Sequence, residues 1–503
     1  MFHLRVAAHC VPLYTAFLKL HFDLTKTPVF DKEIMQNLDD CICLLYKLSP
    51  NVGIPRLPIV GSYWYLLWYN YKYPFKAVTY YANKLKSKVL TCHFGGIVTV
   101  VANDYNSIKE VLTKDDFDGR AGNIDVLLAR SFGESLGIFF VEGLFWQEQR
   151  RFVLRHMRDF GFGRRQEKFE TIAMEEIAIL IDMLKEGPIN DKEKTILKSG
   201  SARFPDILYP YVANTIWYIM FGEKFDRSEY HKLKYFCESA MMFQRALDST
   251  GGALSQFWFL KYFGNMFGYK NVMLGTYRMV DFIKVLNENA KGKSFSEKQL
   301  IMILVDIMFP ASSAVPSALL HTIKLIMHHS EVIKNIREEI DKVVGTGRLI
   351  TWQDRKNLPY IEATIRESLR YETLTPFGVL HKALKRTTLS GFDVAKDTIV
   401  ITNLDGLNTD VDLWGDPHNF RPERFLTEDG KLRKDLTFPF GFGRRVCVGE
   451  TFTRYNMFGI IAVLMQNFNF SFIEDEPNSL KDKMPGLIVS PKEMWIRVEP
   501  RYT

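Results

Sequence analysis

One cysteine near the C-terminal end lies in a run of glycines and arginines that suits metal binding. The segment FGFGRRVCVG places Phe440, Gly443, Arg445, Cys447 and Gly449 in the spacing Phe-x-x-Gly-x-Arg-x-Cys-x-Gly. Glycines permit a tight turn around one sulfur, and a helix beginning after the turn would point N–H groups at a thiolate and lower its pKa. The pattern therefore predicts an axial metal ligand. A small buried side chain beside a glycine turn is the alternative interpretation.

Charged residues upstream form a second group. Glu367 and Arg370 are three residues apart in PYIEATIRESLRYET, where Pro359 suits the start of a helix. Taken alone, they would make an exposed ion pair worth roughly 0.2–0.5 kcal/mol. The later segment FRPERF supplies Arg424, a second guanidinium that can share Glu367 in a buried network. Chance does not readily produce these two motifs and the cysteine turn in this order.

Together these motifs resemble the cytochrome P-450 superfamily of heme-thiolate enzymes, and insect microsomal members most closely. The resemblance implies that Phe440 to Gly449 is the heme-binding loop, with Cys447 as the axial ligand of the iron in heme b. It also implies that Glu367, Arg370 and Arg424 form the structural triad that holds this loop. A thiolate ligand pushes electron density onto the iron and favours cleavage of the O–O bond.

The resemblance further implies a set of residues that contact the two heme propionates. Cationic or polar donors would neutralise two carboxylates whose burial is otherwise costly. Trp146 and Arg150 match the Trp-x-x-x-Arg of the family's C helix. The other expected contacts are Arg120, His381 and Arg445. A solvated arginine or a satisfied buried histidine is the alternative for these last three.

The spacing of apolar residues predicts mainly helix with a minor β portion. Helical spacing predominates over 145–158, 169–184, 216–220 and 300–329, whereas 89–101 and 389–404 have the pattern of short strands. The two patterns do not alternate along the chain, which argues against a doubly wound sheet or a TIM barrel. The resemblance covers roughly residues 55 to 500. It implies the cytochrome P-450 fold, a triangular helical prism with a small β-rich lobe.

Composition narrows the class of protein. The 503 residues are 47% hydrophobic and 24% charged, which excludes disordered, collagen-like and multi-span membrane proteins. A net charge of +7 is too small to indicate nucleic-acid binding. The six cysteines are too irregularly spaced for a disulfide framework, so we expect a reducing compartment. We expect an N-terminal segment, residues 1–54, and a single catalytic domain, residues 55–503.

Two segments bear on membrane attachment. The apolar N-terminus has an uncharged run, Val6 to Leu18, that is shorter than the about 20 residues of a membrane span. We therefore expect a short or atypical anchor and peripheral docking to the cytoplasmic face of the endoplasmic reticulum membrane. The aromatic-rich segment Leu254 to Tyr269 matches the family's connection between the F and G helices, which commonly dips into the membrane. A core helix is the competing interpretation.

The long apolar stretch around residues 300–323 departs from the family pattern. At the position of the family's oxygen-side I helix, Ser313 replaces the usual carboxylate and Ala314 replaces the usual alcohol. Pro310 and Pro316 each delete a helical N–H, so we expect a kinked segment that accepts water. Ser312 or Ser313, with ordered water, would then relay protons.

Three functions follow from this departure. The first is a monooxygenase that inserts one oxygen atom from O2 into an apolar lipid, steroid, terpenoid or xenobiotic, with electrons from NADPH through a reductase. The second is an isomerase or dehydratase that acts on a peroxide in the substrate and needs no reductase. The third is a non-catalytic heme-binding or lipid-binding protein. An acidic reductase would dock on the cationic runs Arg150–Arg165 and Lys431–Arg445, for which a solvated face is the alternative.

By position, the apolar substrate pocket would be lined by residues from several parts of the chain. They are residues 121–139, Phe243–Leu247, Leu304, Met308, Ser312, Thr375–Val379 and Leu487–Val489.

Overall fold

The computed structural model describes residues 53–54, 56–57, 60–122, 124–158, 167–263, 265–287 and 296–502. The chain divides into Met1–Ile54 and a compact unit, Pro55–Thr503, to which the following description applies. Predictions for residues 1–52, including the anchor, lie outside the described residues. The same holds for Arg164 and Arg165 at the end of the first cationic run.

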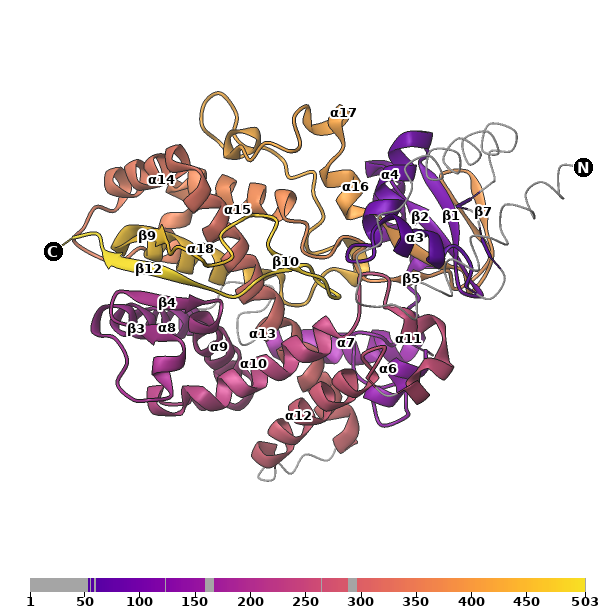
Figure 1. The fold of residues 1–503 in the computed structure, drawn as a ribbon, viewed down its shortest axis with the longest axis horizontal. Coiled ribbons are helices and arrows are strands. Elements are labelled where there is room, and N and C mark those ends of the chain that lie inside the picture. The colour runs from indigo at the N-terminus through magenta and orange to yellow at the C-terminus, as the bar shows by residue number, and fades with distance from the viewer. Residues whose placement is uncertain are drawn as a thin grey trace, which may run out of the picture. The chain divides into compact units, whose positions relative to one another are not determined.

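Helices make up most of the unit (Figure 1). Those predicted at 145–158, 169–184, 216–220 and 300–329 are confirmed as α7, α8, α9 and α13. The helices are α3 (Tyr63–Tyr69), α4 (Phe75–Leu85), α5 (Tyr105–Thr113), α6 (Asp125–Arg130), α7 (Gly143–Arg158), α8 (Glu167–Glu186), α9 (Tyr209–Phe221), α10 (Tyr230–Arg245), α11 (Ala253–Gln256), α12 (Tyr269–Asn287), α13 (Glu297–His328), α14 (Ser330–Val343), α15 (Pro359–Tyr371), α16 (Leu404–Asn408), α17 (Val411–Trp414) and α18 (Glu450–Asn467).

Short 3-10 helices connect several of these elements. The ones used below are η1 (Asp115–Phe117), η5 (Trp258–Phe263), η7 (Pro422–Phe425) and η8 (Gly443–Arg445). Pro359 stands at the first position of α15, where its missing N–H leaves no helical bond unmade.

The strands form two four-stranded sheets and two hairpins. The first sheet has the order β1-β2-β8-β5, from β1 (Val89–Phe94), β2 (Ile97–Ala102), β8 (Ile399–Thr402) and β5 (His381–Lys382). The second has the order β3-β4-β12-β9, from β3 (Leu197–Lys198), β4 (Ser201–Phe204), β12 (Met494–Pro500) and β9 (Phe468–Phe472). The hairpins are β6 (Thr387–Leu389) with β7 (Phe392–Val394) and β10 (Lys483–Met484) with β11 (Ser490–Pro491).

The pairing of the first sheet joins distant parts of the sequence. β1 and β2 form the predicted hairpin, in which Val89 lies opposite Ala102. β2 then pairs in parallel with β8, and Thr99 lies opposite Ile399. In Figure 1 this sheet and the sheet that contains β12 lie on opposite sides of the helices. The prediction of a mainly helical fold with a minor β portion is therefore confirmed.

α13 is the central core helix. It contacts α9, α10, α12, α14, α15 and α18. Between Ile301 and Ile326, every residue is buried except Phe309, Pro310 and Ala314, which are partly exposed. Pro310 and Ala314 lie four residues apart and so share one face of the helix. Among the described helices, α13 alone is long and apolar enough to cross a membrane, but its apolar stretch is mostly buried in protein, as in a core helix.

Candidate active site

The loop before α18 folds tightly around Cys447. Gly441 and Gly443 have φ values of 71° and 69°, a region that residues with a side chain rarely adopt. A Cβ on Gly443 would lie only 2.2 Å from the carbonyl oxygen of Leu112, so this position requires glycine. The backbone N–H of Cys447 donates to the carbonyl of Phe440 at 2.8 Å. These features close the loop predicted from the sequence into a fixed turn.

The thiol of Cys447 is accessible to solvent, yet most of its surroundings are protein atoms. Its side chain is solvent-accessible, yet burial among protein atoms raises the pKa of the thiol. Both observations hold if the sulfur faces a hollow inside the protein rather than bulk water. The backbone N–H of Gly449 and the charge of Arg150 act in the opposite direction. The predicted N–H donor is therefore present, but the predicted lowering of the pKa is wrong because desolvation outweighs it.

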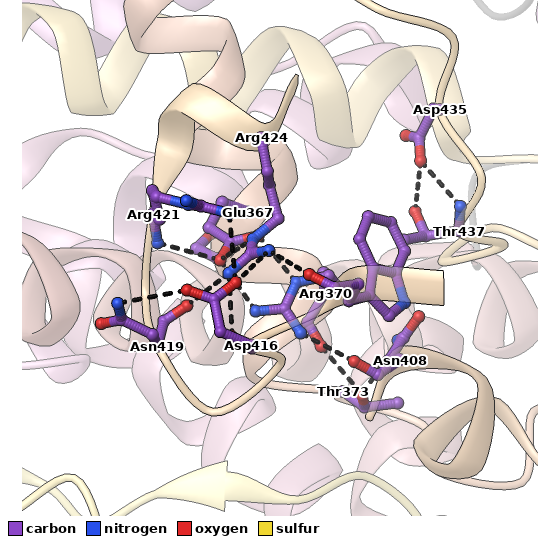
Figure 2. Close-up of polar contacts among 12 residues, drawn as sticks. Glu367, Arg370, Thr373, Asn408, Asp416, Asn419, Arg421, Arg424, Asp435 and Thr437 are labelled. Carbon is purple, nitrogen blue, oxygen red and sulfur yellow. Dashed lines mark hydrogen bonds and ion pairs between the residues drawn. The ribbon is translucent and has the colours of Figure 1, made fainter. Parts of the chain in front are cut away.

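The structure brings Glu367, Arg370 and Arg424 together in one buried network (Figure 2). Arg370 donates to both carboxylate oxygens of Glu367, from Nε at 2.7 Å and from Nη2 at 2.8 Å. Arg424 Nε donates to Glu367 Oε1 at 2.9 Å. The Glu367 and Arg370 side chains have no exposed area. The alternative of an exposed ion pair is therefore excluded for this pair.

The remaining donors of the network hold the chain that precedes the cysteine loop. Arg370 Nη1 donates to the carbonyl of Asn408 at 2.7 Å. Arg424 donates to the carbonyl of Asn419 at 2.8 Å, to the carbonyl of Trp414 at 2.9 Å and to the carboxylate of Asp416 at 3.0 Å. The network thus fastens α15 to residues 408–424, as Figure 2 shows.

A cluster of cations surrounds Trp146 on α7. Arg445 lies over the indole ring, with its guanidinium carbon 3.5 Å from the ring centroid. Arg150, one helical turn after Trp146, donates to the carbonyl of Val446 in the cysteine loop. Arg120 and His381 are also buried, and His381 Nδ1 donates to the carbonyl of Phe117 at 2.7 Å.

The charges in this cluster oppose one another. Burial, together with the charge of Arg120, lowers the pKa of Arg445 to about 8. Burial also lowers the pKa of Arg120 to about 10, with a smaller contribution from Arg150. The pKa of His381 lies well below its usual value because the ring is buried, with a further lowering by Arg120. Such a cluster is stabilised by an anionic group.

Several donors in the cluster have no partner within the protein. Trp146 Nε1 and Arg120 Nε are buried and form no hydrogen bond. Unpaired buried donors are unfavourable and rare in proteins. Two unpaired N–H groups and three guanidiniums suit a ligand with two carboxylates, and the neighbouring Cys447 sulfur suits a soft metal ion. These residues therefore fit a heme with two propionates. No group of three or more His, Cys, Asp or Glu residues that could bind a metal ion occurs in the described part of the chain.

Comparison with known proteins agrees with this geometry. The family model for cytochrome P450 matches residues 53–274 and 268–498. The chain belongs to the cytochrome P450 family. The resemblance inferred from the motifs is confirmed, and the protein is therefore an oxidoreductase of the heme-thiolate monooxygenase family.

Relatives occur in insects and in mammals. The chain is 27% identical to "Farnesoate epoxidase" of Bombyx mori over 477 residues, which cover 90% of this chain and 94% of the relative. It is 30% identical to "Probable cytochrome P450 303a1" of Drosophila melanogaster over 419 residues, or 77% of this chain and 80% of the relative. It is also 30% identical to "Cytochrome P450 2A9" of Mesocricetus auratus over 495 residues, or 91% and 93% of the two chains.

In this P450, the two serines of the predicted proton relay have different surroundings. Ser313 Oγ donates to the carbonyl of Phe309 at 2.9 Å, within α13 itself. Ser312 lies beside Cys237 of α10, where its hydroxyl opposes the rise in thiol pKa that burial causes. Pro310 and Pro316 both lie inside a helix that continues through them. The partly exposed face of α13 therefore presents Pro310 and Ala314, which carry no proton donor.

A buried ion pair that the sequence analysis missed lies between this P450's α6 and α13. Arg130 donates to Asp306 Oδ1, and Asp306 Oδ2 accepts the backbone N–H groups of Ile138 and Phe139 at 2.8 and 2.9 Å. A Cβ on Gly137 would lie 2.1 Å from Asp306 Oδ2, so glycine is required there as well. One acid in the apolar run LVDIMF was the signal in the sequence. Its partner lies 176 residues away and could not be found without the fold.

Proposed function

We propose that this P450 is a heme-thiolate monooxygenase that inserts one oxygen atom from O2 into an apolar small molecule. The observation that carries the proposal is the accessible sulfur of Cys447 in a glycine-shaped loop beside a cluster of buried cations. In this proposal the sulfur of Cys447 would hold the heme iron. The bound heme supplies reductive activation of oxygen, which a thiolate ligand promotes.

The chain's own residues hold and orient this group. Arg120, Arg150 and Arg445 would neutralise the propionates, and the unpaired N–H of Trp146 would be a donor for one of them. His381, held by its bond to Phe117, is a further propionate contact in the proposal. The network of Glu367, Arg370 and Arg424 fixes the segment that leads into the loop.

Apolar side chains support an apolar substrate. Partly exposed apolar residues include Phe139, Phe140, Phe309, Leu374, Val379 and Leu487. Phe309 packs edge-on against Phe243 of α10, with ring centroids 5.1 Å apart. Apolar walls with few polar groups are typical of pockets for small hydrophobic ligands. The name of the Bombyx relative, a farnesoate epoxidase, is consistent with oxidation of an apolar chain.

The face of α13 also supports an isomerase or dehydratase as a second candidate. An oxygen-activating site needs protons, whereas Pro310 and Ala314 supply none and the Ser313 hydroxyl already donates to Phe309. An enzyme that rearranges a peroxide in its substrate does not need an external proton relay. In the monooxygenase, water held near Ser313 or a hydroxyl of the substrate delivers the proton.

An apolar surface suits a membrane. Trp258, Phe259, Tyr262 and Phe263 on η5, with Met266, are exposed by 40–74% of their area. A core helix would bury them, so we propose that this surface docks on the cytoplasmic face of the endoplasmic reticulum membrane. Amphipathic aromatic side chains favour that interface.

A second exposed surface suits an acidic NADPH-dependent reductase. On α7, Arg151, Arg155 and Arg158 are exposed beside Leu144 and Phe152. Lys431, Lys434 and Arg444 are also exposed in the run that leads to the cysteine loop. Cations speed the encounter with an acidic partner, and exposed apolar side chains supply contact area.

The absorption spectrum under carbon monoxide tests the proposal. The purified protein is reduced either by NADPH with a microsomal reductase or by dithionite, in the presence of mixed apolar compounds. A thiolate–CO band with the reductase supports the monooxygenase, and a band with dithionite alone supports the isomerase. Cys447→Ala should abolish the band, whereas Cys237→Ala, which removes a buried thiol elsewhere, should retain it. An unchanged spectrum for Cys447→Ala would refute the ligand assignment.

A further inference from the structure

The segment Leu487–Val489 is held from one side by a buried glutamine at the end of α10. Gln244 Nε2 donates to the carbonyl of Ile488 at 2.9 Å, and the backbone carbonyl of Gln244 accepts the N–H of Leu487 at 3.0 Å. The Gln244 side chain has no exposed area. The preceding residue, Phe243, is the one that packs against Phe309 of α13. Gln244 therefore links this segment to the Phe243–Phe309 ring pair.

A buried histidine holds the same segment from the other side. His321 Nε2 lies 2.9 Å from the carbonyl of Val489, and because a carbonyl only accepts, this nitrogen carries the proton. The other ring nitrogen lies 3.6 Å from Glu372 Oε2, which is paired with Lys483 at 2.5 Å. Burial lowers the pKa of His321, which favours the neutral ring, and the bond to Val489 fixes the tautomer of that ring.

Both anchors lie on helices that carry residues named above, Phe243 on α10 and Phe309 and Ala314 on α13. His321 follows Ala314 by two helical turns and shares its face of α13. The N–H of Val489 donates at 2.8 Å to the carbonyl of Leu374, which is itself one of the partly exposed apolar residues. The position of Leu487 relative to α13 is thus fixed by side chains on two different helices.

We propose that Gln244 and His321 are positioning residues that set the Leu487–Val489 segment as one wall of the substrate pocket and so determine how a long apolar ligand lies. This inference rests on the proposed function. Removing either side chain leaves the two main-chain bonds, from Leu487 N–H and Val489 N–H, in place. The segment therefore stays folded but loses its fixed position, because one carbonyl is left without its donor.

Ligand binding at the heme and hydrogen exchange test the inference on the holoprotein. The variants are Gln244→Leu and His321→Leu, with His321→Gln as the conservative change that keeps a donor. Ser317→Ala is the matched control, because its buried hydroxyl bonds within α13, to the carbonyl of Ser313. The probes are imidazole and 1-dodecylimidazole, which carries a long apolar chain in addition, both detected by the shift of the heme absorption band.

We expect the two leucine variants to change the dissociation constant of 1-dodecylimidazole by about fivefold, the equivalent of one net hydrogen bond. Imidazole affinity and heme content should stay the same, and backbone amides of residues 487–490 should exchange faster. His321→Gln and Ser317→Ala should behave like the native chain.

Unchanged 1-dodecylimidazole affinity and unchanged exchange in both leucine variants would overturn the inference. Loss of heme, or an equal loss of affinity for both probes, would also overturn it, because it would indicate a general structural role. If the native chain gives no heme shift with imidazole, the proposed function fails. The exchange measurement then still decides whether the anchors set the segment.

Discussion

At the scale of single residues, the buried charges form two clusters with opposite character. The cluster around Glu367 is satisfied internally, because each guanidinium meets a carboxylate or carbonyl oxygens. The cluster around Trp146 is not, because burial and the charge of Arg120 lower the pKa of Arg445, and the buried N–H groups of Trp146 Nε1 and Arg120 Nε lack partners. The first cluster is therefore satisfied by the protein itself, and we propose that an anionic ligand completes the second.

The internally satisfied cluster predicts a severe effect of Glu367→Gln. The substitution keeps the shape but leaves the buried guanidinium of Arg370 without a counter-charge and Arg424 with only its pair to Asp416, at a cost of about 3–5 kcal/mol. We expect little folded heme-containing protein, measured as heme absorbance per unit of purified protein. Glu338→Gln is the control, since its pair with Lys334 is exposed at 3.8 Å and should contribute almost nothing. Equal heme content in both variants would contradict the prediction.

The cluster of cations around Trp146 predicts that Arg445→Gln weakens heme retention by about tenfold or more. The measurement is the rate of heme transfer to apomyoglobin. The same measurement with heme dimethyl ester separates charge from packing, because esterification removes the carboxylates. We expect the native and variant proteins to differ with heme but not with the ester. A difference of equal size with both would mean that Arg445 acts through its stacking on Trp146.

At the scale of secondary structure, α13 is an apolar core helix with one face that is partly exposed. Pro310 and Ala314 occupy partly exposed positions of this face. The side chains of Ser312 and Ser313, which follow Pro310, have different neighbours. Ser313 bonds back to Phe309, whereas Ser312 lies beside Cys237. The two serines, which were equivalent candidates in the sequence, can therefore be tested separately.

Peroxide release per NADPH consumed distinguishes the two serines. If Ser313 helps to hold the water that delivers protons, Ser313→Ala should raise peroxide release by about two- to threefold, because more of the reduced oxygen leaves as peroxide before it reacts with substrate. Ser312→Ala should not change peroxide release. Adding Ala314→Thr to either serine variant should lower peroxide release, because threonine adds a hydroxyl to the partly exposed face of α13. An increase in Ser312→Ala alone would contradict this assignment, and no change in either variant would favour delivery by the substrate.

The C-terminal half of α13 predicts a pH dependence of stability. Lys324 is buried and donates to the carbonyls of Pro477 and Ser479 at 2.8 and 2.9 Å, and burial lowers its pKa from 10.5 to about 8. Between pH 8 and 10.5, Lys324 is protonated in the unfolded chain but mostly neutral in the folded protein. The contribution of Lys324 to the free energy of unfolding therefore rises with pH, by at most about 1.4 kcal/mol per unit.

Urea unfolding between pH 7.5 and 10 measures this effect. Lys324→Met should show a smaller rise than the native chain because it lacks the Lys324 contribution, whereas Lys334→Met, at an exposed position on α14, should show the same rise as the native chain. Parallel pH profiles for the native chain and Lys324→Met would contradict the predicted shift.

The sequence was sufficient to predict elements and motifs whose signals are local. Apolar periodicity located α7, α8 and α13, and the spacing of glycines and charges located the cysteine loop and Glu367. Contacts between distant segments could not be predicted this way. The partner of Asp306 and the anchors of Leu487–Val489 depend on which helices pack together. The sign of the Cys447 pKa shift depends on burial, which the sequence did not reveal.

At the scale of the whole molecule, the exposed aromatic surface on η5 predicts membrane affinity. Replacing Trp258, Tyr262 and Phe263 by serine should weaken binding to phosphatidylcholine vesicles by about tenfold or more, because each aromatic side chain loses apolar area at the interface. Sedimentation with vesicles measures the effect. Ile189→Ser with Phe392→Ser is the control, since both side chains are exposed on other elements. Equal losses in both sets would indicate a general decline in folding.

The parallel pairing of β2 with β8 has a consequence for biosynthesis. β2 leaves the ribosome early, but its parallel neighbour follows about three hundred residues later, since Thr99 pairs with Ile399. At translation rates of roughly 5–20 residues per second, one edge of the first hairpin stays unpaired for about 15–60 s. Unpaired strand edges promote aggregation. Nascent chains of this enzyme should therefore depend on chaperones until residue 402 emerges, and capture heme only after Cys447 does.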